Sequence, residues 1–369
     1  MRQRIFGLIV KELLALFRDK RSRFVVIGPP LIQLIIFGYA ATFDVNRVAY
    51  AVYDEENSGT SRELLARFEG SRAFRCLGYI HSNGEIAKVI DRKKVLLVIH
   101  IGRNFSRNLF ASPPARIQVI VDGRNSNTAG ILLGYVNQIV EDFNASWLPL
   151  HGIKPPAGVL RPRAWYNPNL ESRWFIVPGL LATLTLVVSI VTVGLSVARE
   201  REIGTLDQLL VTPMRPWEIV LGKVIPGFLV AMGEVTLIFL AAIFWFRIPF
   251  VGNLLALYVG LAFFSLAVIG VGLIISSISM TQQQALLGSF FFLSPAIVLS
   301  GFSTPLRNMP EVVQWVTLLN PLRFALVVVR RVFLEGAGFA EVWPQYIPMA
   351  LIASISLLAA WGVFRRRVG

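Results

Sequence analysis

The chain has 369 residues, of which 54% are hydrophobic and only 16% charged, and its mean hydropathy is +0.61. This balance excludes an ordinary soluble protein and is typical of a membrane protein with several spans. The net charge of +14 predicts basic side chains that hold cytoplasmic loops against the membrane, so it is no evidence for nucleic-acid binding. The single cysteine, Cys76, allows no disulfide within the chain.

The N-terminal segment, residues 1–23, carries seven basic side chains between apolar residues at helical spacing. This pattern predicts a helix that lies on the anionic lipid of the cytoplasmic surface. A signal peptide is the alternative, but the basic region is long and no small-residue cleavage site follows it. Residues 24–43 are apolar over enough length for a first membrane span, in which Pro29-Pro30 predicts a kink or a late helix start.

Residues 44–172 differ from the rest because charges return and short apolar runs alternate with helical patterns. Such alternation predicts a compact α/β or α+β domain inserted after the first span. Strands are expected at 48–53, 73–80, 95–101 and 117–121, and helices at 58–68, 83–91, 104–110 and 127–147.

The remaining chain predicts five further spans, which makes six in all. They are expected at 174–197, 219–246, 254–278, 284–302 and 346–364. Proline-interrupted residues 305–335 contain apolar runs too short to span, which favours re-entrant or interfacial helices on the outer side. With six spans, the basic clusters before the first span, around 199–223 and in the tail 365–369 are all cytoplasmic, and residues 44–172 are extracytoplasmic.

A charged segment, residues 199–216, separates the second span from the third. Its four alternating charges and Asp207 are costly in hydrocarbon, so the segment is expected at the membrane surface. Ile203, Leu206, Leu209 and Leu210 follow a helical spacing, and Thr212-Pro213 ends the pattern. A short surface helix bounded in this way is a candidate for the part on which another protein pushes.

The sequence contains no motif for chemistry on this chain. Gly222-Lys223 is followed by Val224, with no glycine at the spacing of a phosphate-binding Walker loop. His81, His100 and His151 lie far apart in the sequence, and no metal-ligand spacing or catalytic triad occurs. We therefore expect no enzyme activity, no metal and no cofactor on this chain.

Polar residues inside the expected spans carry more information. Thr185, Ser189, Thr192 and Ser196 share one helical face, which fits either helix packing through small polar residues or the lining of a pathway. Glu234 lies within the third span, where a carboxylate indicates function unless a salt bridge or a position near the interface explains it. Thr185, Ser189, Thr192 and Glu234 are thus candidates for a translocation path.

Residues 200–213 carry the pattern E-x-E-x-G-T-L-x-x-L-L-x-T-P, followed by Gly222-Lys223-x-x-Pro226. This resembles the signature of ABC-2-type transporter permeases, and the basic N-terminal helix, Asn320-Pro321 and the basic tail agree with it. The insertion with Val121-Asp122 looks like that of the bacterial drug-export subgroup. The resemblance covers essentially the whole chain.

The resemblance implies an α-helical polytopic protein of the bacterial inner membrane, with six spans and both termini cytoplasmic. It implies a pair of permease subunits, identical or different, docked on separate ATP-binding subunits that hold ATP and magnesium. Members with an external domain often work with a periplasmic adaptor and an outer-membrane channel. The segment 199–216 would be the coupling helix, and the residues that match the motif would couple it to the ATPase: Glu200, Glu202, Gly204, Thr205, Leu206, Leu209, Thr212 and Pro213.

The expected function is therefore export of a drug-like or other small substrate by alternating access. Two other classes remain open. A membrane receptor or assembly factor would bind a partner through residues 44–172 and would form no stable complex with an ATPase. A membrane-embedded enzyme would need clustered catalytic residues at one membrane face, and the sequence shows none.

Overall fold

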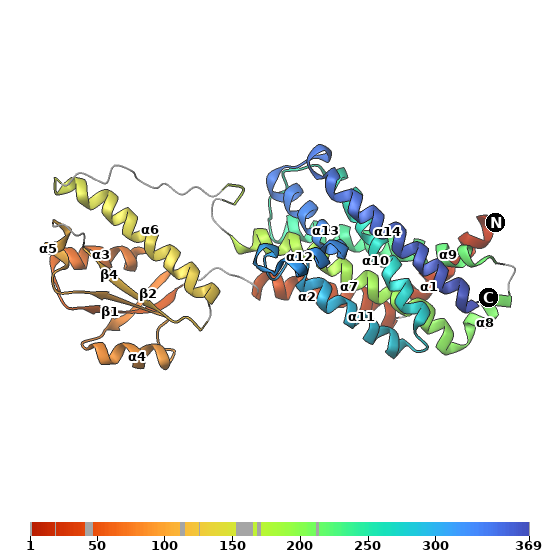
Figure 1. Ribbon diagram of the computed structural model, residues 1–369, viewed down its shortest axis with the longest axis horizontal. Helices are drawn as coiled ribbons and strands as arrows, with labels where there is room; N and C mark the ends of the chain where they lie inside the picture. The colour runs from red at the N-terminus through yellow and green to blue at the C-terminus, as the bar shows by residue number, and fades with distance from the viewer. Residues whose placement is uncertain are drawn as a thin grey trace. The chain divides into compact units, whose positions relative to one another are not determined.

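The computed structural model describes residues 2–18, 20–40, 47–110, 115–124, 126–152, 165–167, 171–211 and 214–368. It divides into two compact units. One comprises Met1–Ala41 with Ala164–Gly369, and the other Thr42–Arg163. The first is a bundle of helices, and the second contains the sheet of the described chain (Figure 1).

The smaller unit is built on a four-stranded sheet with the order β2-β1-β3-β4. The strands are β1 (Val48–Asp54), β2 (Phe74–Tyr79), β3 (Leu97–Ile101) and β4 (Ile117–Val121). Strand β1 runs parallel to β2 and β3, and β4 runs antiparallel to β3. All four lie within one or two residues of the ranges that the alternating pattern predicts.

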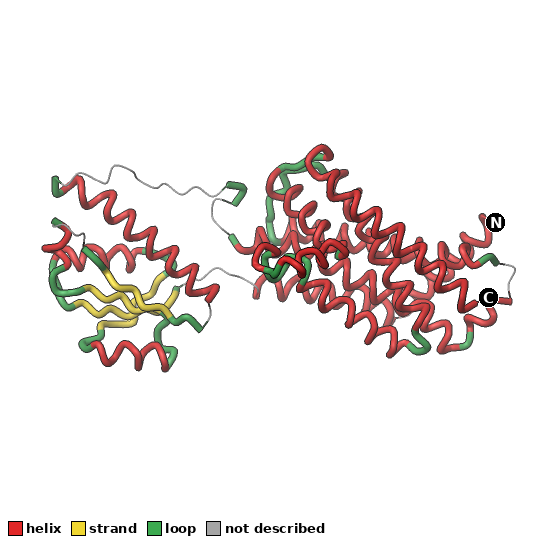
Figure 2. Tube along the Cα trace, viewed as in Figure 1, coloured by secondary structure: helices red, strands yellow, loops and turns green. Residues whose placement is uncertain are grey.

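Helices cover both faces of this sheet, which makes the unit α/β (Figure 2). Helices α3 (Gly59–Gly70) and α6 (Ser126–Leu150) pack on one face around Phe68, Leu97 and Phe143. Helix α4 (Asn83–Asp91) packs on the other face, and the short α5 (Phe105–Leu109) follows β3. Both faces of β1 and β3 are therefore buried, which explains why these strands are almost continuously apolar.

The larger unit contains ten α-helices in its described residues. They are α1 (Arg2–Arg18), α2 (Lys20–Ala40), α7 (Ser172–Ile203), α8 (Thr205–Val211), α9 (Pro216–Leu240), α10 (Leu254–Ile278), α11 (Gln282–Val298), α12 (Glu311–Val316), α13 (Pro321–Arg330) and α14 (Phe339–Val368). Helix α2 runs through Pro29 and Pro30 without a late start.

Four of these helices are long and apolar enough to cross a membrane: α7, α9 with its π-helical end, α10 and α14. The pair of segments Glu311–Leu319 and Pro321–Glu335 is bent by 86°, as a broken span or a re-entrant loop would be. The other two spans expected from the sequence correspond to α2, of 21 residues, and α11, of 17 residues, which are shorter than these four helices. The chain is thus an integral membrane protein with four or five candidate spans in the described residues.

Close contacts between α10 and α14 hold the centre of the bundle together. An added Cβ on Gly270 would collide with Ser356, and one on Gly260 would crowd Tyr346. Ser356 and Tyr346 donate hydrogen bonds to the backbone carbonyls of Ala267 and Ala256. Small residues allow the backbones to approach this closely, as is usual between helices in lipid.

One ion pair in the α/β unit gives it a defined response to acid. Arg124 donates to Asp122 and to the carbonyl of Ile90 at the end of α4. The Arg124 guanidinium lowers the pKa of Asp122 to about 2. The stability that this pair contributes is therefore present above the ordinary aspartate pKa of about 3.9 and is lost as the pH falls toward 2.

We expect Arg124→Gln to make the α/β unit more susceptible to pepsin at pH 4.5 and to leave its susceptibility nearly unchanged at pH 2. Cleavage rates of the full chain across this range provide the measurement. Arg116→Gln, on the same unit but without an ion pair to any described residue, is the control variant. A difference between Arg124→Gln and the natural protein that grows toward pH 2 would contradict the assignment.

Candidate functional site at the junction of α7 and α8

The charged segment after α7 is divided by a glycine. Helix α7 continues through Arg199–Ile203, and Gly204 then adopts φ +79° and ψ +10°, a left-handed conformation that favours glycine. The next helix, α8, is only seven residues long. The expectation of one helix over 199–216 was therefore wrong, because the left-handed turn at Gly204 ends α7 and separates it from α8.

Glu200 lies in a buried cluster of four charges, which we call the ion cluster: Lys11, Glu12, Glu200 and Lys223. Lys11 Nζ lies 2.6 Å from Glu200 Oε1, and Lys223 Nζ lies 2.7 Å from Glu200 Oε2. Lys223 Nζ also lies 3.1 Å from Glu12 Oε1. Two cations and two carboxylates from α1, α7 and α9 thus balance one another.

Burial makes this cluster costly to disrupt. Only 1% of the Lys223 side chain is exposed, whereas Lys11 is half exposed. Burial raises the pKa of the Glu12 carboxyl, and the charge of Lys223 opposes that rise. Helix α1 reaches the cluster because Gly222 leaves room for Leu8, with which an added Cβ would collide.

The two residues after Glu200 make contacts to other helices. Arg201 Nη1 donates to the carbonyl oxygens of Ser277 and Ser279, at 3.1 and 2.7 Å, at the end of α10. Glu202 Oε2 accepts from the backbone N–H of Gln282, at 2.8 Å, and from its side-chain amide. Three consecutive residues therefore tie the end of α7 to α1 and α9, to α10 and to α11.

Helix α8 is anchored at its start and exposed at its end. Leu206 is buried among apolar side chains of α1, α7 and α9, and the Thr205 hydroxyl donates to the carbonyl of Glu200. Val211 is 87% exposed. Ile203, expected on the same apolar stripe as Leu206, is instead exposed, because the turn at Gly204 rotates the two helices relative to each other.

Three of the expected coupling residues come later in the segment than Leu206. Thr212 and Pro213 lie outside the described residues. Leu209 lies in α8. The expected residues that the structure brings together at this junction are Glu200, Glu202, Gly204, Thr205 and Leu206.

A cavity of about 600 Å³ lies next to the ion cluster. Its walls include Lys11, Glu12, Glu200 and Lys223 together with Thr192 and Ser196 of α7. Thr192 also lines a smaller cavity of about 140 Å³ between α2 and α7. Thr185 and Ser189 are buried and line neither cavity, and Thr185 donates to the carbonyl of Leu181 in its own helix. The structure thus brings Thr192, but not Thr185 or Ser189, to a cavity wall.

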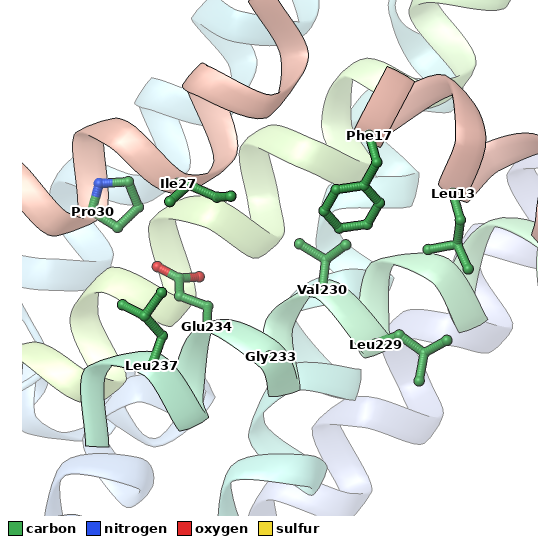
Figure 3. A pocket seen from close by; sticks show the side chains of 9 residues that line it. All are labelled: Leu13, Phe17, Ile27, Pro30, Leu229, Val230, Gly233, Glu234 and Leu237. Atoms are coloured by element: carbon green, nitrogen blue, oxygen red, sulfur yellow. The ribbon is translucent and has the colours of Figure 1, made fainter. Parts of the chain in front are cut away.

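Glu234 lies in a third cavity, of about 310 Å³, between α1, α2 and α9 (Figure 3). Its side chain points from α9 toward Ile27 and Pro30 of α2. Pro30 also lines the cavity between α2 and α7. No salt bridge to Glu234 occurs within the described residues, so the ion-pair explanation for this carboxylate finds no partner there.

Sequence reasoning missed Lys11, Glu12 and Lys223 as site residues. The charges of residues 1–23 were attributed to lipid contact, and Lys223 was assigned to a cytoplasmic basic cluster and to the family pattern, not to an ion pair. The available signal was Lys223 itself, because a lysine inside an apolar helix requires a nearby carboxylate. Within the described residues, no three His, Cys, Asp or Glu side chains gather where they could hold a metal ion.

The family model described as "ABC-2 family transporter protein" matches residues 20–361. The chain belongs to this family. It is 41% identical over the full length of both proteins to the probable multidrug ABC transporter permease YbhR of Escherichia coli (strain K12). The probable multidrug ABC transporter permease YbhS of the same strain is 31% identical to this chain, over 98% of this chain and 94% of YbhS. The inner membrane transport permease YhhJ is 28% identical, over 99% and 98% of the two chains.

The ion cluster gives a stability prediction with an internal control. Lys223→Met removes the cation that contacts both Glu12 and Glu200 and leaves the two carboxylates buried. This change should lower the free energy of unfolding by about 3 kcal/mol. Lys11→Met removes a half-exposed partner and leaves Lys223 in place, so its cost should be about 1 kcal/mol or less. Thermal unfolding of the two purified variants in detergent measures the difference. Equal midpoints for both variants would contradict the ranking.

Proposed function

We propose that this chain is the permease subunit of an ATP-binding-cassette exporter. It moves a drug-like or other small molecule out of the cytoplasm by alternating access. ATP hydrolysis on a separate subunit, which holds ATP and magnesium, drives the cycle. Family membership supports this proposal, and so do the names of YbhR and YbhS, which describe them as probable multidrug ABC transporter permeases.

The observation that carries the proposal is the set of contacts at the end of α7. A partner that displaces α8 must move Gly204 and, through it, the three consecutive charged residues before it. These residues contact α1, α9, α10 and α11. A push at one short helix would therefore reach four other helices, as a transition between two packed arrangements requires.

The geometry suggests different roles for the two coupling carboxylates. Glu200 is occupied by Lys11 and Lys223 inside the chain, so we assign it to holding α1 and α9 on the junction. Glu202 is exposed beside α8, and we assign to it the contact with the ATP-binding subunit. Thr205, Leu206 and Leu209 belong to the proposed docking helix α8, and we assign Thr212 and Pro213, which follow it in the sequence, to the same coupling role.

The proposed topology has six spans, including α2 and α11, in the bacterial inner membrane. Both termini and α8 are then cytoplasmic, and the α/β unit is extracytoplasmic. Helix α11 has 17 residues, or about 26 Å at 1.5 Å per residue, which is slightly less than a bilayer core. A second permease, identical or different, would complete the pathway, with a periplasmic adaptor and an outer-membrane channel as further partners and membrane lipid around α1.

We expect Glu202→Arg to preserve assembly with the ATP-binding subunit and its ATP hydrolysis but to lower export at least tenfold. The reversed charge would misplace α8 on its partner without disturbing the ion cluster. Co-purification, ATP hydrolysis and drug export from proteoliposomes are measured on the same preparation.

Two controls separate the partner contact from the internal one. Gln282→Ala removes the amide donor to Glu202 while keeping the backbone donor, and Glu311→Arg reverses an exposed charge far along the chain. Both should export at nearly the natural rate. Natural export by Glu202→Arg would refute its role in coupling, and failure of the natural chain to co-purify with any ATPase would refute the proposed function.

A further inference from the structure

Glu234 is a buried carboxylate without a partner among the described residues. Its exposed fraction is 7%, and neither carboxylate oxygen accepts a hydrogen bond from any described residue. A carboxylate in such surroundings is costly unless a positive charge or a hydrogen-bond donor reaches it. Glu200 differs, because two lysines contact it, so the described part of the chain supplies cations to one buried carboxylate and not to the other.

The cavity in front of Glu234 is otherwise apolar. Its other walls are Leu13, Phe17, Ile27, Pro30, Leu229, Val230, Gly233 and Leu237. No lysine or arginine is among these lining residues, so the missing charge does not come from the described walls (Figure 3). Phe17, Ile27 and Leu229 are also exposed on the surface of the chain, which leaves an entrance to the cavity.

The space is large enough for a small organic molecule. A volume of about 310 Å³ lies at the lower end of the range of ligand pockets. Gly233, next to Glu234 on α9, would meet no atom within 4 Å if it carried a Cβ. The cavity therefore extends over the helix surface beside the carboxylate.

We propose that this cavity binds a monovalent organic cation with an apolar body, whose charge pairs with Glu234. The inference rests on the proposed function in taking this molecule as a transport substrate, and it names the substrate class. An ammonium or similar group would lie against Glu234, and the apolar body would contact the remaining walls.

Other occupants satisfy the cavity less well. A lipid acyl chain would fill the apolar walls but leave the carboxyl without a partner. A proton alone would neutralise Glu234 but leave a hydroxyl that no described residue accepts. A hard metal ion needs several oxygen ligands, and one carboxylate is the only acidic group among the lining residues.

The test uses the purified full chain in lipid nanodiscs and a radiolabelled probe, benzyltriethylammonium. Its charge is permanent, so the probe does not titrate. The matched ligand is its uncharged carbon isostere, in which carbon replaces nitrogen. We expect the natural chain to bind the cation at least tenfold more tightly than the isostere.

Two variants change charge and shape separately. Glu234→Gln keeps the size of the side chain, and it should weaken cation binding at least tenfold and abolish the preference over the isostere. Gly233→Leu keeps the carboxylate but fills the cavity, and it should weaken both ligands. Glu234→Asp should retain most of the preference, and Glu311→Gln is the matched control. Size-exclusion profiles verify that each variant remains folded.

The outcomes decide the inference. Equal binding of the cation by Glu234→Gln and the natural chain, or equal binding of cation and isostere by the natural chain, overturns it. Failure of the proposed function gives a different result. If the natural chain prefers the cation but no ATP-dependent transport of any compound occurs with its ATPase, the site stands and the export assignment fails. If the complex exports other compounds but the chain does not bind the cation, the export assignment stands and the proposed cation site fails.

Discussion

The buried pairing of Glu200 with Lys223 is the interaction on which the junction of α7 and α8 depends. Lys223 is almost wholly enclosed, so α9 can hold it only while carboxylates from α7 and α1 remain beside it. The pair therefore fixes the end of α7 where the chain turns at Gly204. Because Arg201 and Glu202 follow directly, the same fixed point also positions the contacts to α10 and α11.

Glu200 and Glu234 show how one kind of side chain serves two purposes. Glu200 has two cationic partners, which stabilise a contact among helices. Glu234 has apolar neighbours, so its carboxylate is available to the organic cation that we propose as ligand. The difference lies in what α1 presents: Lys11 and Glu12 face the ion cluster, whereas Leu13 and Phe17 face the cavity of Glu234. One amphipathic helix thus borders both sites.

The elements whose formation depends on neighbouring residues in the sequence could be predicted from the sequence alone. Strands β1 to β4 follow from apolar alternation between turns, and helix α3 follows from the helical pattern that starts at Ser58, whose side chain caps the helix. The ion cluster could not be predicted in this way, because Lys223 and Glu12 are 211 positions apart and only tertiary packing joins them. The helical spacing of residues 203–210 did not show that they belong to two helices, although glycine is the residue that most readily adopts the left-handed turn found at Gly204.

Helix α7 gives the proposed mechanism a continuous mechanical element. Its 32 residues extend for about 48 Å at 1.5 Å per residue, and it begins just after the chain leaves the α/β unit. Apart from Pro178 near its start, it contains no proline, so little within it would absorb a displacement. Gly204 ends α7 in a left-handed conformation, whereas Gly179 and Gly194 lie inside the helix, where an added Cβ would collide with Phe302 and Ser289. A motion applied through α8 would therefore be carried along α7 rather than lost in a flexible segment.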